Sequence, residues 1–300
     1  MSDAYRLFLD PQEVPDEPGW LQRQPMPVLA MGEGGHSQNA DVVLQETADI
    51  DLLRSRIERN PVAAMTLVQV LRAVEQLPVE TGITVESLAY ATLQAGKEYR
   101  LWLESREEAP RLIAGGDGEP IILERSGNTV TAVLNRPGNR NSLTVEMRDA
   151  LVELFDLVLL DDSITRLHLS GSGGCFSIGG ELREFGLAED PAAAHWIRST
   201  HNPGRLLARC AQKVSCHIHS ASLGSGIELP AFAHHISADP GSFFQLPELT
   251  FGLIPGAGGC VSISRRIGRQ RTAWMALSGK KINSSTALAW GLIDELKTSD

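Results

Sequence analysis

The sequence has little that would support a disulfide framework, a membrane span or secretion. Its 300 residues contain only four cysteines, and no two of them form a C-x-x-C pair. No apolar run approaches the roughly 18 residues that a membrane-spanning helix needs. The start of the chain lacks the basic and apolar regions of a signal peptide. We therefore predict a cytoplasmic protein with free thiols and no membrane partner.

Several common motifs of catalysis and ligand binding are also missing. The cluster GSGGCF at 171–176 lacks the third glycine of a dinucleotide-binding fingerprint, and neither a P-loop nor a G-x-S-x-G elbow occurs. The eight histidines include no pair with the H-x-x-x-H spacing of a helical zinc site. The net charge of −10 argues against the basic surface that nucleic acids need. We therefore predict neither a metal site nor a nucleic-acid partner.

The composition is that of a globular protein, with 42% hydrophobic and 21% charged residues. Residues 1–40 are rich in proline, glycine and acidic side chains, which predicts irregular or partly ordered structure. A helix is predicted over 59–77, because Asn60 suits the N-cap and Pro61 the first helical position. A second helix is predicted over 84–106, with Glu86 on the face that turns to water or to a partner. Its apolar stripe consists of Leu88, Ala91, Ala95, Tyr99 and Trp102.

The pattern changes after a linker at 106–120. The segment 121–135 is typical of two strands around a Ser-Gly-Asn turn, and 145–160 of an amphipathic helix. Strands and helices then alternate. We therefore predict an α/β domain over residues 118–300, preceded by an N-terminal region, residues 1–117, that is partly irregular and then helical.

Four stretches in the second region, taken in order, resemble the enoyl-CoA hydratase/isomerase (crotonase) superfamily. LNRPGNRNSL at 134–143 is similar to the family's entry strand and loop, and GGCFSIGGEL at 173–182 to its F-S-A-G-A-D-L segment. SLGSGIEL at 222–229 resembles A-L-G-G-G-x-E-L. FQLPELTFGLIPGAGG at 244–259 resembles F-G-x-P-E-x-x-x-G-x-x-P-G-x-G-G. One stretch alone would be a weak signal, but four in the right order, within a resemblance over about residues 118–297, are specific.

The resemblance implies a core of repeated β-β-α turns, assembled as a homotrimer or homohexamer. It implies an acyl-CoA thioester as the small-molecule substrate, with coenzyme A as part of that substrate and no other cofactor. It also implies an oxyanion hole in which two backbone N–H groups, which by position belong to Ile178 and Ser225, bind the thioester oxygen. Further substrate or CoA contacts are expected from Arg136, Ser177, Gly179, Gly180, Glu181, Gly224 and Gln245.

Two glutamates 20 residues apart, Glu228 and Glu248, complete the expected site. In the hydratases that the chain resembles, both hold one water against the enoyl double bond. Glu228 would deprotonate the water that attacks Cβ, and Glu248 would supply a proton to Cα. The resemblance thus implies a lyase that adds water to an α,β-unsaturated acyl-CoA, with two neighbouring acids driven to different pKa values.

The chain departs from the family pattern at several positions. Ile178, Ser225 and Gln245 replace smaller family residues, and Glu181 replaces an aspartate, which favours an unusual acyl group. The sequence also ends without the family's usual C-terminal helices. We hypothesise that the N-terminal helices replace them in covering the site or in building the oligomer.

Other functions stay open at this point. The same oxyanion hole would serve a double-bond isomerase, a thioester hydrolase, a decarboxylase or a cofactor-free oxygenase. A third reading is a non-catalytic protein on this fold that binds CoA esters or acts as a scaffold.

Overall fold

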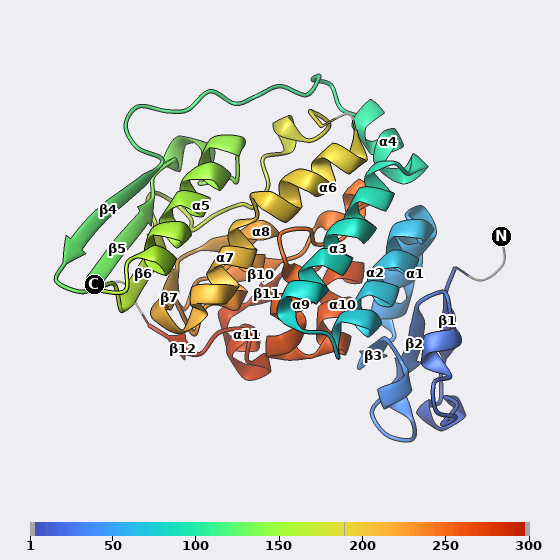
Figure 1. The fold of residues 1–300 in the computed structure, drawn as a ribbon. Coiled ribbons are helices and arrows are strands. Elements are labelled where there is room, and N and C mark those ends of the chain that lie inside the picture. The colour runs from blue at the N-terminus through green and yellow to red at the C-terminus, as the bar shows by residue number, and fades with distance from the viewer. Residues whose placement is uncertain (1–3, 189, 298–300) are drawn as a thin grey trace.

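The computed structural model describes residues 4–188 and 190–297. Its largest sheet has six strands in the order β12-β9-β7-β6-β5-β4 (Figure 1). Neighbouring strands are parallel except in the β4–β5 hairpin. The strands are β4 Ile121–Ser126, β5 Thr129–Leu134, β6 Arg166–Gly171, β7 Val214–Ile218, β9 His235–Ala238 and β12 Glu295–Leu296.

A smaller sheet, β11-β10-β8, is built from β8 Ala221–Leu223, β10 Phe243–Gln245 and β11 Ile282–Asn283. Strand β8 follows β7 and leads into the short helix α8, Ser225–Glu228, while β10 follows β9 and leads into the 3-10 helix η8, Glu248–Phe251. The chain therefore makes two successive strand-strand-helix turns. Strands β8 and β10 pair in parallel, with Leu223 opposite Gln245. The helices that follow these two strands, α8 and η8, therefore start next to each other at the same edge of the sheet.

The expected elements of the second region are confirmed. The hairpin of β4 and β5 turns at Gly127, whose φ of +60° suits glycine. Helix α5 begins after Thr144, whose hydroxyl oxygen accepts a hydrogen bond from the N–H of Met147 at 3.1 Å. Besides α8, the α-helices of this region are α5 Val145–Leu160, α6 Pro191–Thr200, α7 Pro203–Cys210, α9 Gly259–Ile267, α10 Arg269–Ser278 and α11 Ser284–Trp290.

The N-terminal region contains four helices, α1 Ala48–Arg59, α2 Pro61–Val74, α3 Val79–Gln94 and α4 Lys97–Glu104. Asn60 stands at the predicted N-cap of α2, but its side chain donates to the carbonyl oxygen of Leu249 at 2.7 Å. The carboxylate of Glu98 caps α2 instead, because it accepts from the N–H groups of Val62 and Ala63 at 2.8 and 2.9 Å. The single helix predicted over 84–106 is in fact two helices, α3 and α4. Glu98, on α4, provides the N-cap of α2.

A three-stranded parallel sheet precedes these helices. Its strands are β1 Arg6–Phe8, β2 Val28–Met31 and β3 Val42–Leu44. The prediction of irregular structure over 1–40 is wrong for β1 and β2. Strands of three and four residues are too short for the alternation of apolar and polar residues that marks a strand in a sequence, and each pairs with a segment far along the chain.

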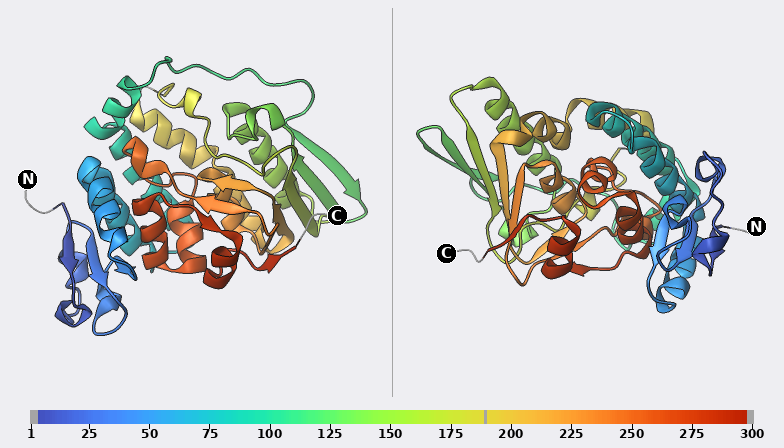
Figure 2. Two further views of the ribbon diagram at one scale, coloured as in Figure 1. Left: turned by 180° about the vertical axis from the view of Figure 1, so that it is seen from behind. Right: turned by 90° about the horizontal axis from the view of Figure 1, so that it is seen from below.

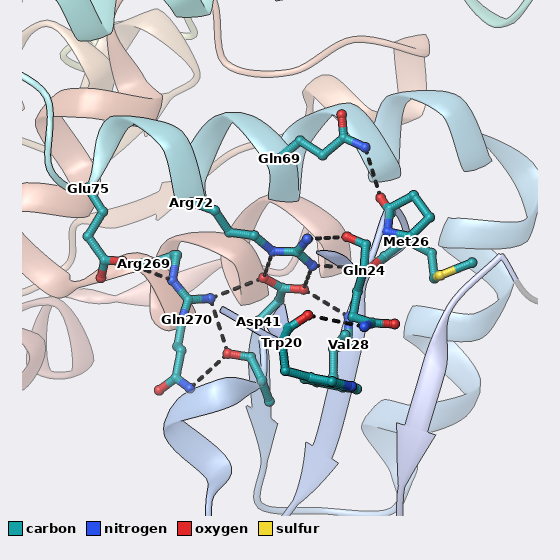
Figure 3. A network of polar contacts seen from close by, with 12 residues as sticks. Trp20, Gln24, Met26, Val28, Asp41, Gln69, Arg72, Glu75, Arg269 and Gln270 are labelled. Atoms are coloured by element: carbon teal, nitrogen blue, oxygen red, sulfur yellow. Dashed lines mark hydrogen bonds and ion pairs between the residues drawn. The ribbon is translucent and has the colours of Figure 1, made fainter. Parts of the chain in front are cut away.

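A buried ion-pair network attaches this sheet to the helices (Figure 3). The carboxylate of Asp41 accepts from Nε of Arg72 on α2 at 2.9 Å and from Nη1 of Arg269 on α10 at 3.0 Å. It also accepts from the N–H of Val28 at 2.9 Å. The side chain of Asp41 is 1% exposed, and those of Arg72 and Arg269 are 5% and 9% exposed. Three parts of the chain that are distant in sequence therefore depend on one carboxylate.

The two regions share one hydrophobic core. Helices α2 and α3 pack on α9, and α1 and α2 pack on α10. One continuous cluster of buried apolar side chains extends from Leu29 in the N-terminal sheet to Ile293. A smaller, separate cluster consists of Val14, Leu21, Val28, Ala30 and Ala40. Both views of Figure 2 place the N-terminal sheet and helices at the end of the molecule opposite β4 and β5. Among the described residues, no helix is both long enough and apolar enough to cross a membrane.

Candidate active site

A cavity of about 570 Å³ is lined by residues of both regions. Helices α3 and α4 supply Tyr90, Gln94 and Tyr99, and α5, α6 and the loop at 180–188 supply much of the remainder. Its volume is within the usual range for a small-molecule site. Of the residues expected to form the site, those that line the cavity are Gly180, Glu181, Ser225, Glu228 and Glu248.

The two glycine-containing loops meet at one wall of this cavity. Ser177 and Ser222 form an isolated parallel bridge, and the N–H of Leu223 donates to the carbonyl of Ser177 at 3.0 Å. Gly179 has a φ of +84°, and a Cβ atom there would lie 2.3 Å from the carbonyl oxygen of Leu223. It would also lie 3.3 Å from the backbone nitrogen of Ser225. Glycine at 179 is therefore required for the close approach of the two loops.

One of the two expected oxyanion donors is different from the prediction. The N–H of Ile178 donates to the carbonyl of Arg140 at 3.2 Å and is not free. Arg140 has a φ of +52°, in the left-handed region. Two residues further on, the N–H of Gly180 has no acceptor among the described residues, and Gly180 lines the cavity. The assignment of Ile178 to the oxyanion hole is therefore wrong, and Gly180 presents the free amide of this loop.

The N–H of Ser225 also has no acceptor in the described part of the chain. Ser225 is the first residue of α8, and the first N–H groups of a helix have no intrahelical partner. The preceding Gly224 has φ +49° and ψ −126°, a conformation that glycine adopts readily. The hydroxyl of Ser225 is buried and likewise unpartnered within the described residues. The Gly224 turn thus exposes one backbone donor at the cavity wall.

The two glutamates lie behind these amides with unequal environments. Oε2 of Glu228 accepts from the N–H groups of Ala257 and Gly259 at 2.7 and 3.0 Å. Oε2 of Glu248 is buried and has no hydrogen-bond partner among the described residues. A Cβ atom on Gly224 would lie 2.6 Å from Oε1 of Glu248, so the glycine makes room for that carboxylate. Glu228 is held by backbone amides, whereas Oε2 of Glu248 accepts no hydrogen bond from the described residues.

A third buried carboxylate, that of Glu86 on α3, binds the same loop. Its oxygens accept from the N–H groups of Gly258 and Cys260 at 2.7 and 2.8 Å. The amides of residues 257–260 thus alternate between Glu228 and Glu86. The prediction that Glu86 faces water or a partner missed this role, because it is only 1% exposed. The buried face of α3 consists instead of Ile83, Glu86, Tyr90 and Leu93. These residues recur at helical spacing, so a periodicity that admitted Glu86 would have identified the face.

Burial shifts the pKa of all three acids upward. It raises the pKa of Glu228 to about 7, against backbone hydrogen bonds that lower it. Burial, and secondarily the charge of Glu228, raise the pKa of Glu248 well above its usual range. The same two causes raise the pKa of Glu86. Backbone hydrogen bonds thus favour the ionised form of Glu228, whereas burial and the charge of Glu228 favour the protonated form of Glu248.

The N-terminal helices complete the wall next to these acids. The ring of Tyr90 packs on Gly256, where a Cβ atom would lie 2.3 Å from Cε2 of the ring. The guanidinium of Arg198, on α6, lies 4.5 Å from the centroid of the same ring. Helices α3 and α4 thus line the candidate site, while their replacement of C-terminal helices and their part in an oligomer stay predictions.

The other expected substrate contacts lie outside the cavity wall. All the N–H groups of the Arg136 guanidinium are used: two donate to Glu146 at 2.9 and 2.7 Å, and the others donate to the backbone carbonyls of Gly118, Glu119 and Asn135. The side-chain amide of Gln245 donates to the carbonyl of Gly279 at 2.7 Å. The hydroxyl of Ser177 donates to the carbonyl of Asn141 at 2.7 Å. These side chains hold the loops of the site in place.

Glu181 lines the cavity but is already paired. Its carboxylate binds Nε of Arg183 at 2.7 Å and accepts from the hydroxyl of Ser142 at 2.8 Å. Hydrogen bonding to Arg183 lowers the pKa of Glu181 to about 2, against the effect of burial. A carboxylate so strongly paired is unsuited to proton transfer near neutral pH.

Comparison with known proteins agrees with this architecture. Residues 124–300 match the family model described as enoyl-CoA hydratase/isomerase. The chain belongs to the enoyl-CoA hydratase/isomerase family. The N-terminal sheet and helices α1–α4 lie outside the match.

Two curated relatives of this family member come from Escherichia coli. The 2,3-dehydroadipyl-CoA hydratase is 29% identical over 180 residues, which are 60% of this chain and 70% of the relative. The 1,2-epoxyphenylacetyl-CoA isomerase is 31% identical over 179 residues, 58% of this chain and 68% of the relative. An enoyl-CoA hydratase structure from Thermoplasma volcanium is 31% identical with a TM-score of 0.55, covering 61% of this chain and 73% of that one. The predicted crotonase-like α/β fold is therefore confirmed.

Proposed function

We propose that this member of the enoyl-CoA hydratase/isomerase family is a hydratase-like lyase that adds water to an α,β-unsaturated acyl-CoA. One observation carries the proposal: two unpartnered backbone amides and two buried carboxylates of unequal acidity line one cavity. The donors are those of Gly180 and Ser225, and the acids are Glu228 and Glu248. Backbone donors aimed at a developing oxyanion are worth roughly 10²–10³ in rate each.

The unequal acidity of the glutamates supports a division of labour between them. Glu228, ionised, takes a proton from water as the water oxygen bonds to Cβ. The electron pair of the double bond moves toward the thioester, whose oxygen becomes enolate-like between the two amides. Glu248, protonated, then gives its proton to Cα, so that the net change is the addition of one water. Proton exchange with solvent restores the starting ionisation of both acids.

A second reaction, migration of the double bond, needs only one acid that both takes and returns a proton. Oε2 of Glu248 is unpartnered in the described residues whereas Oε2 of Glu228 is held by two amides, so Glu248 would serve this reaction from its ionised form, which burial disfavours. The names of the relatives include both a hydratase and an isomerase, so family membership does not separate the two reactions. As the resemblance implies, we also propose a homotrimer or homohexamer, which sedimentation velocity tests.

Separate Glu228→Gln and Glu248→Gln variants distinguish these reactions. The assay incubates short- and medium-chain trans-2-enoyl-CoA esters with the protein and separates the products by chromatography before mass spectrometry. Hydration gives a product heavier by one water, and isomerisation gives a separate product of unchanged mass. Hydration requires both acids, so each variant is expected to lose about 10²–10⁴ in rate. Isomerisation would be lost only in Glu248→Gln. Glu184→Gln, which changes another carboxylate on the cavity wall, is the matched control and is expected to keep its rate.

Ligand binding tests the proposal at a coarser level. A ligand that binds only the native state raises the melting temperature. Acyl-CoA esters are expected to do so, and a protein that no CoA ester stabilises would be a scaffold on this fold rather than an enzyme of acyl-CoA chemistry.

A further inference from the structure

Arg198 lines the cavity and has no role in the proposed chemistry. Its Nε donates to the hydroxyl of Ser87 at 3.2 Å, and its guanidinium stacks on Tyr90. Its Nη2 atom is buried and has no hydrogen-bond partner among the described residues. Within that part of the chain, no carboxylate forms an ion pair with it. A buried donor without an acceptor is costly, which points to an acceptor supplied by a ligand.

The neighbouring acids do not neutralise this cation. Glu86 and Glu248 form no hydrogen bond or ion pair with Arg198 among the described residues, and burial raises the pKa of both and so opposes their ionisation. Glu181 is paired with Arg183, and Glu184 accepts from the N–H groups of Ile113 and Val145. The wall around Arg198 therefore keeps an unbalanced positive charge.

The position of Arg198 relates it to the acyl chain. Tyr90 packs on Gly256, in the loop whose next amides hold Glu228, and the same ring carries the Arg198 guanidinium. One aromatic ring therefore lies between the loop that holds Glu228 and the unpaired cation. An acyl chain that extends a few carbons beyond Cβ along Tyr90 would bring its end to Arg198.

We propose that Arg198 binds a terminal carboxylate on the acyl group, so that the substrate is the CoA thioester of a short dicarboxylic acid. This inference rests on the proposed function. A guanidinium matches a carboxylate in charge and in planar geometry. Ser87 and Tyr90, both on α3, fix the guanidinium, so the N-terminal region, which lies outside the family match, contributes to substrate choice.

The test compares two saturated five-carbon esters by isothermal titration calorimetry, glutaryl-CoA with a terminal carboxylate and pentanoyl-CoA with a methyl group. The wild type is expected to bind glutaryl-CoA roughly 10- to 100-fold more tightly. Arg198→Met is expected to abolish that preference, and Arg198→Lys to reduce it. Arg148→Met is the matched control: Arg148 also lines the cavity but is paired with Asp149, and its variant is expected to keep the preference.

The outcomes separate the two proposals. Equal binding of both esters by the wild type, or a preference that survives in Arg198→Met, would overturn the role of Arg198 and leave the acyl-CoA function intact. Tighter binding of pentanoyl-CoA would likewise overturn it in favour of an apolar acyl group. Failure of the wild type to bind either ester would overturn the proposed function together with this inference.

Discussion

Ser225→Pro is the substitution that removes an oxyanion donor with the least disturbance of the fold. Proline has no N–H group, and it is favoured at the first position of a helix, which Ser225 occupies. The lost N–H has no acceptor among the described residues, and neither has the serine hydroxyl. Gly224 before it tolerates the restriction that proline imposes on its neighbour. We therefore expect the free energy of unfolding to change by less than about 1 kcal/mol.

The expected kinetic effect is much larger. Loss of one oxyanion-hole donor costs about 10²–10³ in kcat, or about 2.7–4 kcal/mol of transition-state stabilisation. The assay follows loss of enoyl absorbance with crotonyl-CoA, or with a better enoyl-CoA found in the substrate panel. Ser225→Ala keeps the N–H and removes only an unpartnered hydroxyl, so it is expected to keep near wild-type kcat. A proline variant that folds and retains kcat within about fivefold would refute the assignment of the Ser225 amide to the oxyanion hole.

Three further substitutions test the electrostatics of the fold and the site. The pKa of Glu228 is about 7 in the folded protein, against an ordinary value of 4.5. Its contribution to the free energy of unfolding is therefore fully present below about pH 4.5 and is lost as the pH rises through about 7. Urea unfolding of the wild type is expected to show a loss of about 3 kcal/mol from this group by about pH 8–9, which Glu228→Gln removes; an unchanged pH dependence in the variant would contradict the shift. Glu86→Gln is expected to cost about 1–3 kcal/mol, because one of two buried amides loses its acceptor, and to move the pH–rate profile. Glu98→Gln breaks a similar pair of backbone bonds away from the cavity and should leave the profile unchanged; a shift in both variants or in neither would argue against a role for Glu86 at the site. Asp41→Asn is expected to destabilise by about 3–5 kcal/mol, because it leaves the buried Arg72 without a carboxylate and Arg269 with only the exposed Glu75. Glu17→Gln, in an exposed pair with Arg23, should cost less than about 1 kcal/mol; similar losses in both would show that the Asp41 network is not needed for stability.

Much of the second region could be predicted because its signals are local. The Ser-Gly-Asn turn sets the β4–β5 hairpin, and the 20-residue interval between Glu228 and Glu248 equals one strand-strand-helix turn of the chain. The motifs also located both loops of the candidate oxyanion hole. The motifs do not show which backbone N–H groups of these loops are already bonded within the protein. The left-handed conformation of Arg140, which turns its carbonyl toward the N–H of Ile178, leaves no mark in residue type, so the free amide of Gly180 was missed.

The N-terminal region was harder to predict because its functional residues break the hydrophobic pattern. Glu86, Ser87 and Tyr90 are polar or amphipathic residues on the buried face of α3, while Leu88 is 51% exposed. A periodicity analysis assigns such a face to solvent. The arginine at 198 gave no signal in the sequence either, since only the structure shows that its charge is unpaired beside the cavity.

A crystal structure with bound pentanoyl-CoA tests the central claim most directly, because this saturated thioester cannot be hydrated. We expect its carbonyl oxygen to lie about 2.7–3.1 Å from the backbone nitrogens of both Gly180 and Ser225, with Cα and Cβ facing Glu248 and Glu228. A thioester oxygen bound elsewhere, or bound by the N–H of Ile178 after release from Arg140, would contradict it.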